Sequence, residues 1–301
     1  MTLTRASQSD PKVSVVIASR NEGELLRRTV DSFLETLPER SEIVVVDDCS
    51  NDASAEFLRD GYHGVTLLAP RRSRGASAAR NHGVGRTRGE VVVFSDAHVE
   101  LPEDWLPPLR AALDSETAGV VAPGLSSLSD QSLTGFGHKW DGELRWQWQR
   151  KRSEEPYCVP FGGAGFVAMR RDLFRRVGGF DPGILIWGSI GDELCLRLWL
   201  LGYECIIVPG VVVPHLFRAK HPYEIDWKAV LHNQMRMAVL HMNEERVSRL
   251  FQRHASRAGF VAGMSHLLAG DAWRLRQHYR SIRLRDDDWF FDEFGMDILT
   301  G

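Results

Sequence analysis

Cysteine is scarce in this sequence, and no two cysteines form a CxxC pair. The four thiols, Cys49, Cys158, Cys195 and Cys205, are scattered over a chain of 301 residues. This spacing excludes a disulfide framework or a zinc knot and favours reduced, partly buried thiols. A reducing compartment is therefore expected.

Long hydrophobic runs and an excess of one charge are also missing. No apolar run approaches the roughly 18 residues that a membrane-spanning helix needs, and the polar N-terminus MTLTRASQSDPK lacks the apolar core of a signal peptide. The formal net charge of -3 does not indicate a general nucleic-acid-binding surface. We therefore expect a cytoplasmic protein with no membrane span and no nucleic-acid partner, and the oligomeric state stays open.

What the sequence does contain is a regular alternation of apolar runs and helical patterns. The strand-like runs are VSVVIA at 13–18, EIVVVDD at 42–48, GVTLLA at 64–69 and EVVVFSD at 90–96. Helical patterns separate them at 25–37, 53–60 and 76–86. Such alternation predicts an α/β fold with a mostly parallel central sheet flanked by helices.

The alternation breaks after residue 100, but no low-complexity linker divides the chain there. Residues 101–223 contain a glycine-rich stretch and further apolar runs, so we expect them to share one sheet and one domain with residues 13–100. Residues 224–301 are mainly helical in pattern and are predicted to form a C-terminal extension, while residues 1–12 form a flexible N-terminus. The acidic, aromatic end of the extension gives no clear prediction.

Polar residues directly after each apolar run should line a ligand crevice, because ligands bind beyond the carboxyl ends of parallel strands. Asp96 and His98 follow one such run and, in an extended segment, would project to the same side. A carboxylate with an imidazole suits Mn²⁺, with Mg²⁺ as the alternative. His215, after the run Val211 to Val213, is the predicted third ligand. The competing interpretation is that Asp96 caps a turn and His98 is an ordinary polar residue.

A site for a diphosphate is predicted beside this metal. The arginines that would neutralise its phosphates are Arg71, Arg72, Arg74 and Arg80. They could instead form a solvated helix face. Asp47 and Asp48 have the wrong charge for phosphate and are expected to accept hydrogen bonds from a base or ribose. Four residues beside the strand ends are assigned to the same nucleotide site: Ala18, Arg20, Glu22 and Ala97.

The order of these motifs resembles a known family. VVIASRNEGELLRRTV, EIVVVDDCSND, RGASAARNHG and VVVFSDAHVE resemble the nucleotide-sugar half of family 2-like glycosyltransferases with the GT-A (Rossmann-like) fold. The DxH form, followed by FGGAGFVAMRRDLFRRVGGFDPGILIWG, HLFRAKHPY and HNQMRMA, is most similar to the catalytic domain of polypeptide N-acetylgalactosaminyltransferases, over about residues 13 to 245. The resemblance implies a GT-A catalytic domain at 13–223, with a nucleotide-binding half at 13–100 and an acceptor-side half at 101–223.

The resemblance also implies roles for individual residues. Asp48 would contact the uracil, Arg80 would face the nucleotide, and Asp96, His98 and His215 would bind Mn²⁺. Trp187 would line the sugar-phosphate site. A mobile loop closing over the pyrophosphate would contain Arg218, His221 and Tyr223, with bends at Gly210 and Pro222.

The sequence departs from the family at the position of the usual catalytic carboxylate. Those enzymes carry Glu-Asn after WGG, and inverting relatives carry Glu-Asp, but this chain aligns Ile190 and Gly191 there. Asp192 and Glu193 come directly after them. Asp192 is kept as a candidate catalytic residue, whereas Glu193 fits the first turn of a helix, where the macrodipole favours a carboxylate. The missing base favours retention at the anomeric carbon.

The predicted activity is metal-dependent transfer of a hexose or N-acetylhexosamine from a UDP-sugar to a hydroxyl of a peptide or small natural-product acceptor. Trp140, Trp146 and Trp148 would either form an aromatic platform for that acceptor or serve ordinary packing. Two alternatives stay open, namely a nucleotidyltransferase that builds a nucleotide sugar and a UDP-sugar-binding protein without turnover.

Overall fold

The computed structural model describes residues 12–59, 62–142, 144–218 and 221–296. The predicted flexible N-terminus lies almost entirely outside these ranges. In the first part, strands and helices alternate as the apolar pattern predicts. The elements are β1 (Val13–Ser19), α1 (Glu24–Thr36), β2 (Ser41–Asp47), the 3-10 turn η1 (Glu56–Leu58), β3 (Val65–Leu68), α2 (Gly75–Val84) and β4 (Val91–Ser95).

Local chemistry explains where these elements end. Helix α1 stops at Thr36, and Leu37 is extended with ψ 143° because Pro38 follows it. The prediction of a helix at 53–60 was wrong, since this segment forms only the short turn η1. Ala55 and Leu58 are its only buried apolar residues, which leaves no amphipathic face long enough to stabilise an α-helix.

The second part adds strands to the same sheet and ends in helices. Its first elements are α3 (Leu106–Ala112), β5 (Ala118–Ser127), β6 (Thr134–Gly135), β7 (His138–Trp140), β8 (Trp146–Trp148), β9 (Tyr157–Cys158), β10 (Phe166–Arg170) and α4 (Arg171–Arg176). They are followed by α5 (Ile190–Leu200), β11 (Glu204–His215), α6 (Trp227–His241), α7 (Glu244–His254), α8 (Phe260–Ala269), α9 (Ala272–Ile282) and α10 (Asp287–Glu293).

The central sheet has the strand order β3-β2-β1-β4-β10-β5-β11-β9, with β6 added beside β5. The pairs β2–β3, β1–β2, β1–β4 and β5–β11 are parallel, whereas the pairs β9–β11 and β5–β6 are antiparallel. The predicted α/β fold with a central sheet flanked by helices is confirmed, and its parallel strands form two groups. Strand β10 is antiparallel to both of its neighbours, β4 and β5. It therefore joins the two parallel parts into one sheet. Strands β7 and β8 form a separate antiparallel hairpin.

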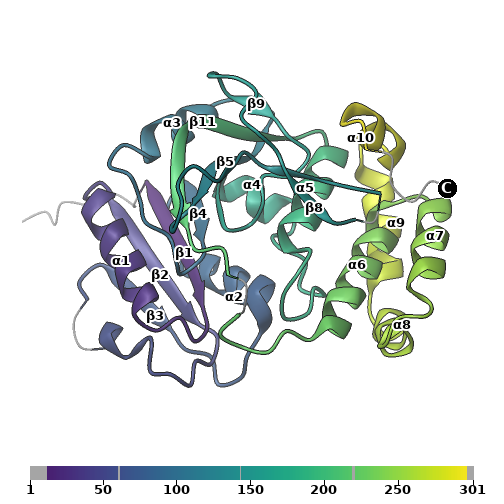
Figure 1. The fold of residues 1–301 in the computed structure, drawn as a ribbon, viewed down its shortest axis with the longest axis horizontal. Helices are drawn as coiled ribbons and strands as arrows, with labels where there is room; N and C mark the ends of the chain where they lie inside the picture. The colour runs from purple at the N-terminus through teal and green to yellow at the C-terminus, as the bar shows by residue number, and fades with distance from the viewer. Residues whose placement is uncertain (1–11, 60–61, 143, 219–220, 297–301) are drawn as a thin grey trace, which may run out of the picture.

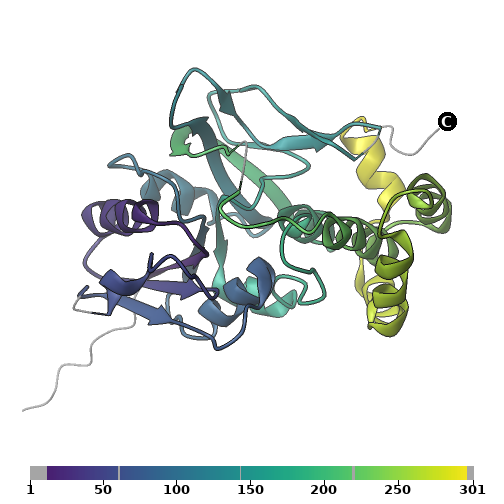
Figure 2. The same ribbon diagram turned by 60° about the horizontal axis from the view of Figure 1, so that its bottom comes forward.

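The C-terminal helices share their core with the sheet. Figures 1 and 2 show α6 to α9 gathered at the end of the molecule opposite β1 to β3. One cluster of buried side chains nevertheless runs from Val16 and Phe94 in the sheet to Leu240 in α6 and Phe290 in α10. The division at residue 224 stays a prediction. The acidic tail forms α10, whose first turn is capped by the Asp286 side chain.

All four cysteines are free thiols, and Cys195 and Cys205 are buried. Across the described residues, none of the helices combines the length and the apolar character that a bilayer crossing requires.

Backbone pairing brings distant polar residues to one edge of the sheet. Strands β1, β2 and β4 run in register, so Ser19 lies beside Asp47 and Ile17 beside Ser95. At the end of β11, His215 forms an isolated bridge with Val99. The next residue, Leu216, donates its N–H to the carbonyl of His98 at 3.0 Å. These contacts place His215 against the segment after β4.

Candidate active site

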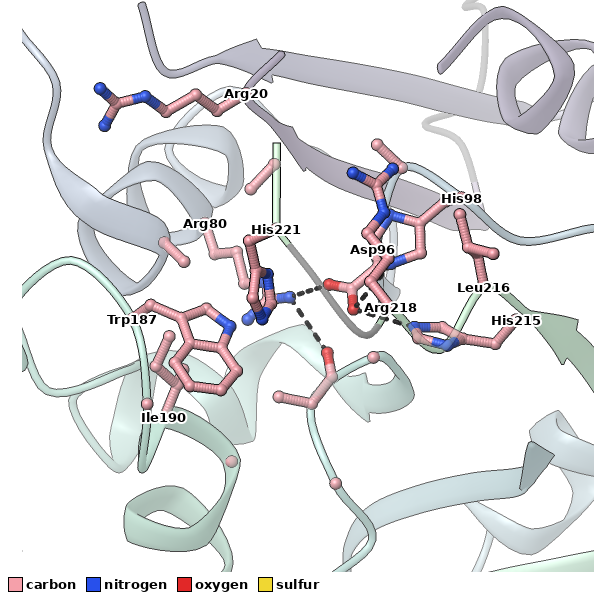
Figure 3. A pocket seen from close by; sticks show the side chains of 18 of the residues that line it. Arg20, Arg80, Asp96, His98, Trp187, Ile190, His215, Leu216, Arg218 and His221 are labelled. Atoms are coloured by element: carbon pink, nitrogen blue, oxygen red, sulfur yellow. Dashed lines mark hydrogen bonds and ion pairs between the residues drawn. The ribbon is translucent and has the colours of Figure 1, made fainter. Parts of the chain in front are cut away.

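Asp96, His98 and His215 come together at this edge, as the sequence predicted. Their ligand atoms all lie within 4.8 Å of one another. The distance to Asp96 Oδ2 is 3.2 Å from His215 Nε2 and 3.9 Å from His98 Nε2 (Figure 3). The prediction assumed an extended segment, whereas β4 ends at Ser95 and a bend comes next. The three side chains converge despite that bend.

The residues around this cluster fit a divalent metal. One carboxylate and two imidazoles are a donor set suited to Mn²⁺. Gly165, whose carbonyl accepts the N–H of Asp96, lies directly over the cluster. A Cβ at this position would lie 3.3 Å from both Asp96 Oδ2 and His215 Nε2, so glycine leaves the space between these ligands open.

Glu22, in the loop between β1 and α1, fixes the orientation of His98. Its Oε2 lies 3.1 Å from His98 Nδ1, and it also pairs with the guanidinium of Arg218. Occupying Nδ1 leaves Nε2 of the same ring directed toward Asp96. This is the usual arrangement in which a carboxylate sets the tautomer of a metal-binding histidine.

We therefore expect Glu22→Gln to weaken Mn²⁺ binding by about 10-fold or more, the range found when partners of metal ligands are removed. Calorimetric titration of Mn²⁺ in the presence of UDP measures this. Glu24→Gln, an exposed carboxylate in the first turn of α1, is the matched control and should leave affinity unchanged. Equal affinities for both variants would contradict the role given to Glu22.

Asp96 is held in its ionised form. Burial by itself raises the pKa of Asp96, but a hydrogen bond from His215 and the charge of Arg80 outweigh it and lower the pKa to about 2. Arg80 Nη2 donates to Asp96 Oδ1 at 2.6 Å and to the carbonyl of Ala164 at 3.1 Å (Figure 3). Arg80 thus lies at the cluster, as its predicted place on the nucleotide side requires.

The cluster opens into a cavity of about 360 Å³. The predicted site residues that line it are Ala18, Arg20, Glu22, Asp48, Arg80, Asp96, Ala97, His98, Trp187, Asp192, His215, Arg218, His221 and Tyr223. Other predictions for this region were wrong. Arg71, Arg72 and Arg74 are exposed and do not line the cavity, because the chain turns into α2 only at Gly75.

Asp48 and Asp47 have different surroundings. The carboxylate of Asp48 accepts hydrogen bonds from Ser73 Oγ at 2.7 Å and from the backbone N–H groups of Arg74 and Gly75 at 2.6 and 3.0 Å. It therefore holds the start of α2 while lining the cavity. Its contact with a uracil stays a prediction. Asp47 accepts the N–H of Ser50 and does not line the cavity.

The predicted closing loop borders the cavity in part. His221 packs edge-on against Trp187 at a centroid distance of 4.9 Å, and the guanidinium of Arg20 lies 5.6 Å from the ring centre of Tyr223. Residues 219 and 220 of this loop lie outside the described residues. The bend expected at Gly210 was misplaced, because Gly210 lies inside β11, where the register with β5 shifts between Val208 and Val212.

The tryptophans divide between lining and packing. Trp146 and Trp148 are 47% and 45% exposed and line the cavity, and Trp148 packs against Phe217. Trp140 is buried against Phe161 in the core. Trp146 and Trp148 thus lie where an acceptor platform was predicted, whereas Trp140 serves packing, and the platform itself stays a prediction.

Asp192 and Glu193 occupy different environments. Asp192 accepts hydrogen bonds from the indole N–H groups of Trp140 and Trp146 at 3.1 and 2.7 Å, and its Oδ1 lies 2.9 Å from His138 Nε2. These contacts use the carboxylate to hold the β7–β8 hairpin at the cavity. Glu193 is fully buried and forms an ion pair with Arg197, in keeping with the structural role expected for it.

With this geometry in place, comparison with known proteins gives the family. The model of glycosyl transferase family 2 matches residues 14–178, more than half of the chain. The chain belongs to glycosyl transferase family 2. A second family model, described as the N-terminal domain of galactosyltransferase, matches residues 149–222.

The chain is also similar to curated proteins that are N-acetylgalactosaminyltransferases by name. The chain is 27% identical over 317 residues to N-acetylgalactosaminyltransferase 7 of Drosophila melanogaster, covering 96% of this chain and 53% of that protein. It is 31% identical over 259 residues to polypeptide N-acetylgalactosaminyltransferase 11 of Xenopus tropicalis, covering 78% and 43%. The chain thus spans about half the length of the curated relatives it matches.

A solved structure confirms the predicted GT-A fold. The crystal structure of GalNAc-T7 with UDP, GalNAc and Mn²⁺ matches with a TM-score of 0.76 at 23% identity, covering 96% of this chain and 57% of that one.

Two features of this family 2 site were not anticipated from sequence. Gly165 gave no signal beyond its glycine-rich stretch, and Glu22 was assigned to the nucleotide rather than to His98.

Proposed function

We propose that this chain is a metal-dependent glycosyltransferase. It would transfer a hexose or N-acetylhexosamine from a UDP-sugar to a hydroxyl of a peptide or small natural-product acceptor, with retention. The observation that carries the proposal is the convergence of Asp96, His98 and His215 inside a cavity that also contains buried guanidinium groups.

Those guanidinium groups have unused donors. Within the described residues, the Nε–H groups of Arg20, Arg80 and Arg218 are buried and have no hydrogen-bond acceptor. Buried donors are nearly always satisfied in proteins, so three unsatisfied ones around a single cavity indicate a ligand rich in acceptor oxygens. A diphosphate provides such oxygens and carries the charge that guanidinium binds best.

In the proposed site, Asp96, His98 and His215 would hold Mn²⁺, with Mg²⁺ as the alternative. When bound, the ion would supply positive charge that stabilises the diphosphate leaving group. Arg218 would donate to the phosphate oxygens, and its segment with His221 and Tyr223 would exclude water from the donor. Trp187 would line the sugar side of the same cavity.

Retention is favoured because the carboxylate that the sequence offered as a base is already engaged in the described part of the chain. Asp192, the candidate base, is occupied by two indole donors and by His138. Removing a general base slows a reaction by about 100- to 10,000-fold, so we expect Asp192→Asn to keep transfer within about 10-fold of the wild type. Initial rates at saturating donor measure this, with thermal unfolding to compare folding of the two proteins. A fall of a thousandfold in a folded variant would make Asp192 the base.

The relatives support the donor class without fixing the sugar. They are N-acetylgalactosaminyltransferases by name, and the GalNAc-T7 structure contains UDP, GalNAc and Mn²⁺. In this chain, Ile190 and Gly191 stand where the family carries Glu-Asn, so the donor sugar is left open between hexose and N-acetylhexosamine. The cytoplasmic location stays a prediction.

The proposal is tested by incubating the protein with Mn²⁺ and a panel of UDP-sugars, with hydroxylated peptides and small hydroxyl compounds as acceptors. Release of UDP with formation of a glycoside is the expected result, and NMR of the anomeric proton then gives the stereochemistry. A parallel reaction with UTP and sugar 1-phosphates should release no pyrophosphate. Pyrophosphate release would indicate a nucleotidyltransferase, and Mn²⁺-dependent UDP binding without turnover of any donor would indicate a binding protein.

A further inference from the structure

The segment that carries Trp187 is held by two side chains of the C-terminal helix α6. Asn233 on α6 is fully buried, and its amide bonds mainly to this segment, while His232 Nδ1 lies 3.1 Å from its Oδ1. Oδ1 accepts the N–H of Leu185 at 2.8 Å. Nδ2 donates to the carbonyls of Leu185, Trp187 and Gly188 at 2.8, 3.0 and 3.2 Å. One amide thus fixes four backbone groups around Trp187.

The backbone of this segment would not hold its shape unaided. Ile186 has φ 47° and Ser189 has φ 59°, both in the left-handed region, with Gly188 at φ 96° between them. A β-branched residue in this region is a rare and strained conformation that persists only where surrounding contacts impose it. The bonds from Asn233 to either side of Ile186 are such contacts.

The same segment is held from the nucleotide side. Ala76 at the start of α2 donates its N–H to the carbonyl of Ile186 at 3.0 Å, and a Cβ on Gly75 would lie 2.9 Å from the Ile186 nitrogen. Gly75 in turn donates to Asp48 at 3.0 Å. The Trp187 segment therefore lies between the start of α2, which Asp48 fixes, and Asn233 of α6.

A second side chain of α6 fixes the beginning of the segment. Arg236, one turn after Asn233, donates to both carboxylate oxygens of Asp181 at 2.6 and 2.9 Å and to Asp271 before α9 at 2.8 Å. The guanidinium packs directly on Gly183, where a Cβ would approach it to 2.0 Å. The α6 helix thus supports the whole stretch from Asp181 to Gly188.

We propose that Asn233 is a positioning residue for the donor site: it acts through Trp187 and sets where this ring stands against His221 and Trp146 in the cavity. Asn233 does not line the cavity itself. The kinetic part of this inference rests on the proposed glycosyltransferase function. The placement of the Trp187 ring can be measured without any turnover.

The kinetic test compares Asn233→Ala with Lys228→Ala, an exposed position on the same helix. Misplacing a wall of the site by about 1 Å costs on the order of 100-fold in rate, so kcat for transfer should fall by about that factor in Asn233→Ala, with a higher KM for the UDP-sugar. Mn²⁺-dependent binding of UDP should stay within about twofold of the wild type, because UDP lacks the sugar. Lys228→Ala should match the wild type in all three quantities. Loss of UDP affinity in parallel with kcat would overturn the proposal in favour of a general structural role.

The second test is ¹⁹F NMR of protein labelled with 5-fluorotryptophan, in which Trp187→Phe identifies the Trp187 resonance. Asn233→Ala should shift or broaden that resonance and leave the resonance of the buried Trp105 in place. If this variant does not fold, Asn233→Leu, which keeps the size of the side chain but removes its donors and its acceptor, should give the same selective change. An unaltered Trp187 resonance would overturn the inference. If the wild type transfers no sugar, the proposed function fails, while the NMR comparison still decides the role of Asn233.

Discussion

Mn²⁺-dependent binding of UDP should fall by at least about 100-fold in His215→Ala and in His98→Ala. Removing an outer partner of a metal ligand costs about 10- to 100-fold in affinity, and each of these substitutions removes a ligand itself. With only Asp96 and one imidazole left, the site would hold the ion too weakly to contribute to UDP binding. Calorimetric titration of UDP with and without Mn²⁺ measures the difference.

The control for this prediction is His278→Ala, an exposed histidine on α9 far from the cluster in sequence and fold. It should leave both titrations unchanged. Thermal unfolding in the absence of metal shows whether each variant is folded. A folded His215→Ala protein with wild-type affinity would remove His215 from the metal site, and the proposed leaving-group chemistry would lose its third ligand.

The metal cluster could be predicted from sequence because parallel strands bring its residues to one edge of the sheet. The apolar runs that form parallel strands end at the same edge of the sheet, so polar residues after separate runs of this kind meet there. Asp96 and His215 are far apart in the chain, yet both directly follow long apolar runs. The sequence could not predict the pairing of β11 with β5. It could predict the edge of the sheet at which His215 lies.

The arginines after β3 show a limit of prediction from sequence. Arg71, Arg72 and Arg74 also follow a strand, but they precede α2 and are exposed, while the guanidinium groups that line the cavity come from Arg20, Arg80 and Arg218. Sequence position gives the edge of the sheet but not the direction of a side chain in an irregular loop. The positioning role of Asn233 could not be predicted from sequence for a similar reason, because this role depends on the unusual backbone of the distant Trp187 segment.

Asp192 and Glu193 illustrate the same limit at neighbouring positions. Both are carboxylates in the first turn of α5, and the sequence favoured a structural role for Glu193 but left the role of Asp192 undecided. Successive residues of a helix point about 100° apart. Asp192 consequently meets the β7–β8 hairpin at the cavity, whereas Glu193 points to α6, where His241 Nε2 lies 2.8 Å from its Oε1. The packing of α5 against α6 therefore decides which of the two carboxylates faces the cavity.

The contact of Glu193 with Arg197 leads to the largest expected effect on stability. Two hydrogen bonds of 2.9 Å join the side chains, which are 0% and 1% exposed, and Arg197 also donates to the carbonyl of Gly179 at 2.6 Å. Arg197→Ala would leave the carboxylate buried without its cation, which costs about 3 to 5 kcal/mol in free energy of unfolding. Urea unfolding monitored by circular dichroism measures this.

Arg176→Ala is the matched control, because Arg176 and Asp172 form an ion pair at the same helical spacing with side chains 63% and 65% exposed. Exposed pairs contribute about 0 to 1 kcal/mol, so similar losses in both variants would contradict the prediction.

The pH dependence provides a second comparison. Burial raises the pKa of Glu193, but the charge of Arg197 and the hydrogen bond from His241 outweigh it and lower the pKa from 4.5 to about 2. The pair therefore stabilises the fold above about pH 4.5, and this stabilisation is lost as the pH falls toward 2, because the unfolded chain takes up the proton first. Arg197→Ala should flatten this acid dependence, since it removes the charge that lowers the pKa, whereas Arg176→Ala should retain it.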